Sequence, residues 1–354
     1  NRPQISYRLL IATTNRIGRG SLDTIEGQEK PVGLILRSDL EKADVIWPTH
    51  PGDLRAPRPK PKTPRPHNRE AIQAVREGFE GADRGQLVMA CGTGKTLIGL
   101  WTAEALQSRR TLVLLPSLSL LAQTLREWTA NAKESFEFLP VCSDETVRGE
   151  DHMVSHTAEL GMPVTTDPAV IASFLRKRTK ARVVFSTYQS SPQVAAALDE
   201  ARVPGFDLVI ADEAHRVAGP VSSDFATVLD ENAIRARRRL FMTATPRYFS
   251  GKVRREANQQ EFEVASMDDA ARFGAIFHRL SLGEAIDREL LTDYQVVIVG
   301  VDDPTYKRYV EEGTFVTRDG KRVTDARSLA AHISLAKAMR DFDLRRTISF
   351  HSRI

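Results

Sequence analysis

The chain has 354 residues and sets 50 Lys and Arg against 46 Asp and Glu, so its formal net charge is +4. This length predicts two or three structural units, and the mildly basic balance is compatible with nucleic acid without indicating it by itself. No apolar run reaches the roughly 20 residues that span a bilayer, so no membrane partner is expected, and two cysteines, Cys91 and Cys142, exclude a disulfide framework and favour a reduced, cytoplasmic compartment.

The first 55 residues predict a small α/β piece. Two short β-like runs, at 7–12 and 32–36, flank a polar segment. The tract APRPKPKTPRP at 56–66 follows, and its prolines predict a semi-rigid extended linker over 56–64. The chain begins at Asn1 without Met and ends just after an apolar run, so we expect a segment of a longer protein.

After the linker, short apolar runs alternate with helical patterns. We expect strands at 86–90, 111–115, 182–186, 207–211 and 239–243, and helices at 97–108, 118–130, 167–179, 190–201 and 222–235. Continuous apolar runs are typical of buried parallel strands, and their alternation with helices predicts an α/β doubly wound sheet. In such sheets ligands bind at the carboxyl ends of the strands.

The stretch LVMACGTGKTLIG at 87–99 predicts a phosphate-binding loop. It has the Gly-Lys-Thr ending of the pattern Gly, four residues, Gly-Lys-Ser/Thr, but Met89 stands where the first glycine is expected. The loop follows a strand and opens a helix, so successive backbone N–H groups would form an anion nest. Lys95 would contact the β and γ phosphates and Thr96 would bind Mg²⁺. The alternative is an ordinary strand-to-helix turn.

A pair of carboxylates, Asp212 and Glu213, follows the apolar run 208–211. A strand that ends in such a pair suits a magnesium nucleotide site, with Asp212 in the metal shell and Glu213 orienting and deprotonating the attacking water. The alternative is a helix N-terminus, which acidic residues also favour. Further along, the hydroxyls of Thr243 and Thr245 in the turn TATP could link this site to a neighbouring one.

These three patterns, in this order, resemble the superfamily 2 helicases and translocases. MACGTGKT is similar to motif I, DEAH to motif II and TATP to motif III; LLPSLSLLAQT at 114–124 and FSTYQS at 185–190 resemble motifs Ia and Ib, and the final ISFHSRI resembles motif IV. The resemblance covers about 65–354 and is greatest to the motors of restriction systems, of the type III and single-chain type I-like kinds. It implies a RecA-like P-loop NTPase fold with a first RecA-like domain at 65–250, a connecting segment at 251–292 and the beginning of a second RecA-like domain at 293–354.

The resemblance also implies roles for individual residues. RPHNREAI at 65–72 is similar to the family segment near the adenine, with Asn68 where the family often has Gln. His215 would bridge motif II to motif III or to the second domain. Ser117 and Thr187 match positions near motifs that contact the nucleic-acid backbone, although helix or turn capping explains them equally well. The expected nucleotide-binding set is Arg65, Asn68, Cys91, Gly92, Thr93, Gly94, Lys95 and Thr96.

Together these observations predict an ATP- and Mg²⁺-dependent motor that acts on nucleic acid, with double-stranded DNA as the expected partner. The first 55 residues resemble the tail of a restriction-endonuclease-like domain, with a non-catalytic α/β cap as the alternative. The full protein could therefore carry nuclease or methyltransferase domains. Two other functions stay open: a general DNA-repair or RNA-remodelling helicase, and a nucleotide-dependent binding module that does not hydrolyse ATP. Because the arginine-finger motif lies beyond residue 354, we expect this segment alone to bind ATP and hydrolyse it poorly.

Overall fold

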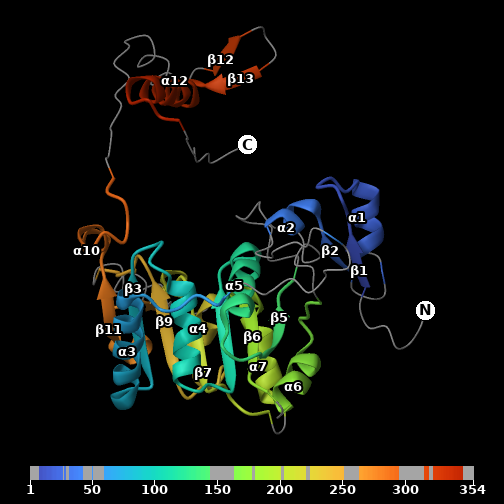
Figure 1. The fold of residues 1–354 in the computed structure, drawn as a ribbon, viewed down its shortest axis with the longest axis vertical. Coiled ribbons are helices and arrows are strands. Elements are labelled where there is room, and N and C mark those ends of the chain that lie inside the picture. Colours follow the sequence, from blue (N-terminus) through green and yellow to red (C-terminus); the bar gives the residue numbers. More distant parts are fainter. Residues whose placement is uncertain are drawn as a thin grey trace. The chain divides into compact units, whose positions relative to one another are not determined.

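The computed structural model describes residues 8–26, 28, 32–42, 50, 60–143, 163–177, 180–200, 203–220, 224–250, 263–294, 315–318 and 322–345. The chain divides into two compact units, 1–291 and 292–354, and each is described by itself (Figure 1). The ATP-site motifs predicted above all belong to the first unit. None of the helices in the described ranges is both long and apolar enough to cross a membrane.

Within the described residues, one sheet of parallel strands organises the first unit (Figure 1). Its order is β11-β3-β9-β7-β4-β6-β5. The strands are β3 (Arg84–Met89), β4 (Arg110–Leu115), β5 (Glu137–Val141), β6 (Arg182–Thr187), β7 (Leu208–Ala211), β9 (Arg239–Thr243) and β11 (Ala275–Leu280). Five of them are the predicted apolar runs, so the predicted α/β parallel sheet is confirmed.

Helices cover both faces of this sheet. The main ones are α3 (Pro66–Gly81), α4 (Lys95–Ala105), α5 (Leu118–Asn131), α6 (Pro168–Arg176) and α7 (Ser191–Asp199). Alternate strand residues point to opposite faces, so two cores form. One core joins the strands to α3, α4 and α5, and the other joins them to α6, α7 and the short helix α9 (Ala270–Phe273). Four of the five predicted helices are therefore present, and the predicted start of α6 is confirmed because Asp167 accepts a hydrogen bond from the Ala169 N–H at 2.9 Å.

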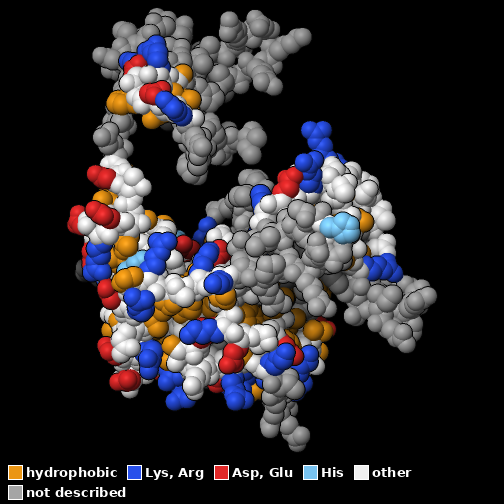
Figure 2. Space-filling model, viewed as in Figure 1, with side chains coloured by type: hydrophobic (Ala, Val, Ile, Leu, Met, Phe, Trp, Pro, Cys, Tyr) orange, Lys and Arg blue, Asp and Glu red, His pale blue; other side chains and the backbone are white. Residues whose placement is uncertain are grey.

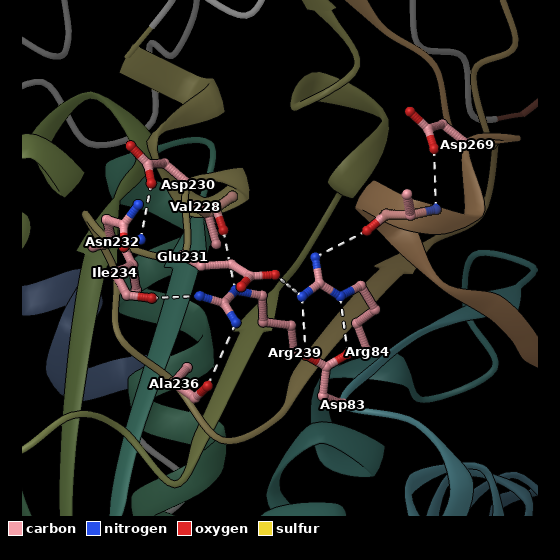
Figure 3. A network of polar contacts seen from close by, with 11 residues as sticks. Asp83, Arg84, Val228, Asp230, Glu231, Asn232, Ile234, Ala236, Arg239 and Asp269 are labelled. Atoms are coloured by element: carbon pink, nitrogen blue, oxygen red, sulfur yellow. Dashed lines mark hydrogen bonds and ion pairs between the residues drawn. The ribbon is translucent and has the colours of Figure 1, made fainter.

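The predicted helix at 222–235 is wrong. This segment contains a short 3-10 helix, η6 (Asp224–Leu229), followed by turns. In this segment Asp230 Oδ1 accepts a hydrogen bond from the Asn232 N–H at 2.8 Å, and the buried guanidinium of Arg239 donates to the carbonyls of Val228, Ile234 and Ala236 (Figure 3). Carbonyls bonded to a side chain from a neighbouring strand are drawn out of helical geometry, and a local sequence pattern does not record such a contact.

A second arginine, Arg84, connects the segment 224–235 to the amino end of β3. Arg84, at the start of β3, pairs with Asp83 and Glu231 and donates to the Ala271 carbonyl at 3.0 Å (Figure 3). Asp83 and Glu231 raise the pKa of Arg84. The network lies at the amino ends of β3 and β9, whereas the phosphate loop follows the carboxyl end of β3.

Two strands of the sheet were not predicted. β5 contains Pro140, and β11 is interrupted by His278 and Arg279, so neither reads as a continuous apolar run. β11 lies within the predicted connecting segment 251–292, yet it pairs in parallel with β3. Small elements complete the unit: η4 (Tyr188–Ser190), η5 (Ala214–Arg216), α10 (Leu282–Asp287) and the antiparallel pair β8 (Gly219–Pro220) and β10 (Val264–Ala265).

The chain ends hold smaller pieces. Near the start, β1 (Arg8–Ile11) pairs in parallel with β2 (Val32–Ile35), accompanied by α1 (Arg19–Glu26) and α2 (Arg37–Lys42). The end of the predicted linker is anchored on α5, where the Lys62 N–H donates to Asn131 Oδ1 at 2.8 Å. The second unit contains the hairpin β12 (Phe315–Arg318) and β13 (Arg322–Asp325) and the helix α12 (Ala326–Asp341). The predicted strand at 295–300 and the motif IV-like segment 348–354 lie outside the described residues.

Candidate functional site

The loop between β3 and α4 has the backbone of an anion nest. Gly92 and Gly94 have φ angles of 82° and 93°, in the left-handed region that favours glycine. The Thr93 hydroxyl donates to the Ala90 carbonyl at 2.7 Å and stabilises the turn. Gly94 is the N-cap of α4, so the loop presents backbone amides and the positive end of a helix together.

Met89, the departure from the expected motif, is explained by its position in β3. It is the last residue of the strand, its side chain is fully buried in the core, and its φ is not positive, so no glycine is needed there. The Lys95 ammonium lies back over the loop and donates to the Met89 carbonyl at 3.1 Å and the Ala90 carbonyl at 3.4 Å. Position 89 therefore contributes a main-chain oxygen to the site.

The start of α3 packs directly against the loop. His67 Nε2 lies 3.1 Å from the Thr93 carbonyl oxygen, and Asn68 Nδ2 donates to the same oxygen at 3.0 Å. Asn68 Oδ1 accepts a hydrogen bond from the Arg65 N–H at 3.0 Å. Both His67 and Asn68 are only 4% exposed, whereas Arg65 is exposed. An adenine contact by Asn68 or Arg65 stays a prediction, and the bonds that Asn68 makes are to protein.

The acidic pair follows β7 at the same edge of the sheet. Asp212 is 7% exposed and accepts a hydrogen bond from the Glu213 N–H at 2.9 Å. Burial, and secondarily the charge of Glu213, raise the pKa of Asp212 to about 6, while Lys95 acts in the opposite direction. Glu213 has φ 49° and ψ 45°, a left-handed conformation that costs a non-glycine residue of order 1 kcal/mol and is often found at functional sites. The loop lysine and the buried carboxylate therefore act on each other electrostatically.

β9 lies between β3 and β7, and this order joins the TATP turn to the acidic pair. Thr243, at the end of β9, is fully buried; its hydroxyl lies 3.1 Å from His215 Nδ1 and accepts a hydrogen bond from the Thr245 N–H at 3.1 Å. His215 Nδ1 is also 3.4 Å from a Glu213 oxygen. Burial lowers the pKa of His215, and Glu213 partly offsets that effect. A chain of contacts thus runs from Glu213 through His215 to Thr245.

The two predicted nucleic-acid contacts have local partners. Ser117 is the N-cap of α5 and accepts a hydrogen bond from the Leu120 N–H at 3.3 Å. Thr187 is fully buried, and its hydroxyl donates to Ser190 Oγ at 3.1 Å. These contacts match the capping alternative, and the nucleic-acid role of both residues stays a prediction. In the basic run 235–239, Arg235 and Arg239 donate hydrogen bonds to backbone carbonyls of the protein. Figure 2 shows Lys and Arg interspersed with Asp and Glu on the face in view.

Three residues contribute to the site although the sequence assigned them no role, and two of them, His67 and Tyr188, lie inside the quoted segments RPHNREAI and FSTYQS. His67 contacts the loop carbonyl as described above. The buried Tyr188 hydroxyl donates to the Asp212 carbonyl at 2.7 Å, and the Trp128 indole N–H donates to the Thr96 carbonyl at 2.9 Å. Each stabilises the backbone of a predicted site residue. These contacts could have been predicted from the sequence only if the order of the strands in the sheet were already known.

Comparisons with known proteins match this geometry. The family described as "Type III restriction enzyme, res subunit" matches residues 61–248, slightly more than half of the chain. The solved ATP-dependent Type ISP restriction-modification enzyme LlaBIII, bound to DNA, is 30% identical with a TM-score of 0.76, over 94% of this chain and 22% of that one. A nuclease-deletion mutant of the Type ISP enzyme LlaGI, in complex with a DNA substrate mimic, is 31% identical with a TM-score of 0.51, over 71% of this chain and 22% of that one.

Curated relatives include the "Probable helicase A859L" of African swine fever virus. The protein of the isolate Tick/South Africa/Pretoriuskop Pr4/1996 is 29% identical over 250 residues, which are 70% of this chain and 25% of the relative. The chain thus spans about a quarter of the length of the curated relatives it matches.

Proposed function

Because the chain belongs to the family described as type III restriction enzyme, res subunit, with a superfamily 2 helicase core related to restriction-system motors, we propose that its first unit binds and hydrolyses ATP to drive movement on double-stranded DNA. The observation that carries the proposal is the strand order β3-β9-β7. It brings the phosphate loop, the TATP turn and the acidic pair to one edge of the sheet.

The oxygen donors at this edge fit a magnesium nucleotide. Asp212 is a buried carboxylate with a raised pKa beside the loop lysine, and a carboxylate together with the Thr96 hydroxyl is a donor set that Mg²⁺ prefers. When bound, the ion neutralises charge on the phosphates. In the proposed site, Asp212 and Thr96 hold the ion.

The other residues divide the work of hydrolysis. The amides of 91–94 and the Lys95 ammonium bind and orient the phosphates. Glu213, which has a left-handed backbone conformation, orients the attacking water and accepts its proton. His215, Thr243 and Thr245 transmit a change at Glu213 to the TATP turn. Ser117 is proposed to contact the DNA backbone. The side chain of Thr187 is fully buried, so a DNA contact at this position is proposed through the main chain of its turn.

Duplex DNA is proposed because both similar solved restriction enzymes are described with DNA. A role in restriction of foreign or phage DNA, with nuclease or methyltransferase domains elsewhere in the protein, is proposed on the same likeness. The proposed layout is an N-terminal accessory or nuclease-like piece at 1–55, a linker at 56–64, a first RecA-like domain at 65–250 and a second beginning at 293.

The test is phosphate release by the full-length protein with ATP and Mg²⁺, with duplex DNA or RNA added, combined with displacement of a triplex-forming strand. Duplex DNA should stimulate hydrolysis at least about tenfold and the third strand should be displaced. Stimulation by RNA alone would favour an RNA-remodelling helicase, and separation of the duplex strands would favour a repair-type helicase. ATP binding without turnover would favour a non-hydrolysing module.

A further inference from the structure

The Thr93 carbonyl oxygen receives two buried side chains from one helix start. His67 Nε2 lies 3.1 Å away and Asn68 Nδ2 lies 3.0 Å away. A carbonyl oxygen carries no hydrogen, so both nitrogens must donate, and the Nε2 of His67 carries the proton. Among the described residues, His67 Nδ1 has no hydrogen-bond partner, which leaves the Thr93 contact as the polar bond of this imidazole.

These two bonds fix the orientation of an amide that faces the other way. The Thr93 carbonyl and the Gly94 N–H belong to one planar trans peptide group, and the two point in opposite directions. When α3 holds the carbonyl on its side, the Gly94 N–H is directed away from α3. Gly94 has φ 93° and caps α4, so rotation of its peptide plane is otherwise permitted by the glycine.

The amide oxygen of Asn68 is also hydrogen-bonded to the protein. This Oδ1 atom accepts the Arg65 N–H at 3.0 Å, which ties the start of α3 to the same side chain. The side chain is 4% exposed, and its amide nitrogen would lie 3.4 Å from a Cβ at position 94. Each end of the amide keeps one further hydrogen-bonding site, but protein bonds fix its orientation and little of the side chain is accessible, so Asn68 is poorly placed to distinguish one nucleobase from another.

We propose that His67 and Asn68 together form a carbonyl clamp on Thr93 that orients the phosphate loop, and that Asn68 does not read the adenine base. They are positioning residues, since they act through the loop. The inference rests on the proposed ATP site and deepens it. It predicts that nucleotides are recognised here mainly through their phosphates, with little preference among bases from Asn68.

The test compares ligands that share phosphates and differ in the base. Binding of ATP, GTP and inorganic tripolyphosphate, each with Mg²⁺, is measured by calorimetry on the full-length protein and on His67→Phe, Asn68→Asp and the double variant. His67→Phe keeps a ring and removes the donor, and Asn68→Asp keeps the oxygen that bonds Arg65. Val75→Ala, in a fully buried position of the same helix, is the control for lost stability without a contact to the loop.

His67→Phe should bind all three ligands about five- to tenfold more weakly, because one hydrogen bond to the loop is lost. Asn68→Asp should weaken all three by at least as much, because it also sets a carboxylate oxygen against the Thr93 carbonyl oxygen. The double variant should lose at least the product of the two factors, because no donor from α3 is then left on the carbonyl. Val75→Ala should leave all three affinities unchanged at a temperature where it is folded.

Three results would overturn the clamp. In the first, Asn68→Asp weakens ATP binding but leaves tripolyphosphate binding unchanged, which would make Asn68 a base-reading residue. In the second, His67→Phe changes no affinity. In the third, Val75→Ala changes the affinities as much as the clamp variants do. If the parent protein binds neither ATP nor tripolyphosphate, the proposed function fails and the clamp fails with it.

Discussion

Replacing Asp212 by Asn should stabilise the protein above neutral pH while it removes nucleotide binding. Asp212 is buried at the end of β7, and burial together with Glu213 raises the pKa of its carboxyl from 3.8 to about 6. Asn has nearly the same shape and can still accept the hydrogen bond from the Glu213 N–H. The substitution therefore removes the buried charge and leaves the local packing intact.

The sign follows from proton linkage. The folded protein binds the Asp212 proton more tightly than the unfolded chain does, so stability falls as pH rises through the interval from 3.8 to about 6. Above that interval the full cost is present, about 3 kcal/mol for a shift of about two units. At about pH 5 the destabilisation by the Asp212 charge is roughly half as large. The advantage of Asp212→Asn over the parent should thus grow by about 1.5 kcal/mol between pH 5 and pH 8.

Urea unfolding monitored by tryptophan fluorescence measures this difference. Trp101 and Trp128 are buried in the core beside the sheet, and a Trp47→Phe background shared by both proteins removes the third tryptophan. Measurements are made without Mg²⁺ or nucleotide, because a bound cation would stabilise the charged form of Asp212. Equal stability differences at both pH values would refute the argument that Asp212 is desolvated.

Three further outcomes are expected. Glu213→Gln should bind ATP normally and lower its hydrolysis at least about 100-fold, measured as phosphate release beside a binding titration; normal turnover would remove Glu213 as the base. Thr243→Val, which keeps the shape of a buried side chain and removes its bond to His215, should leave ATP affinity intact and lower DNA-stimulated turnover about tenfold, and equal loss of unstimulated turnover would argue against coupling. Arg239→Met should lower the free energy of unfolding by about 3 kcal/mol or more without changing ATP affinity below the melting temperature, and an unchanged urea midpoint would show that the Arg239 bonds are dispensable.

The sequence predicts the central strands of the sheet because their apolar runs are long enough to be buried on both faces. It also predicts which residues end those strands, and hence Lys95 and Asp212 at one edge. It fails at 222–235, where apolar and polar residues recur at helical spacing. There Asp230 Oδ1 accepts hydrogen bonds from the Asn232 and Ala233 N–H groups, and the carbonyls of Val228 and Ile234 bond to Arg239, which comes from a strand later in the chain. The second set of contacts is not local, so the local pattern cannot record it.

The sequence also does not predict which hydrogen bonds the side chains around the phosphate loop make. A motif match predicts that Asn68 lies near a nucleotide, but the match does not record that both ends of its amide bond to protein. His67 lies inside the segment RPHNREAI, but the resemblance of that segment assigns it no role. Both contacts depend on the distance between α3 and the loop, which tertiary packing sets.

The order of the strands in the sheet differs from their order along the chain. In the sequence the loop comes first, the acidic pair second and the TATP turn last, so the turn looks peripheral to the chemistry. In the sheet β9 lies between β3 and β7, with Val88 paired to Thr243 and Ala211 paired to Phe241. A displacement of β3 or β7 relative to the other must therefore pass through β9. Since the Thr243 hydroxyl contacts His215, which contacts Glu213, the turn is placed to respond to both halves of the site, and Thr243→Val is expected to separate coupling from nucleotide binding.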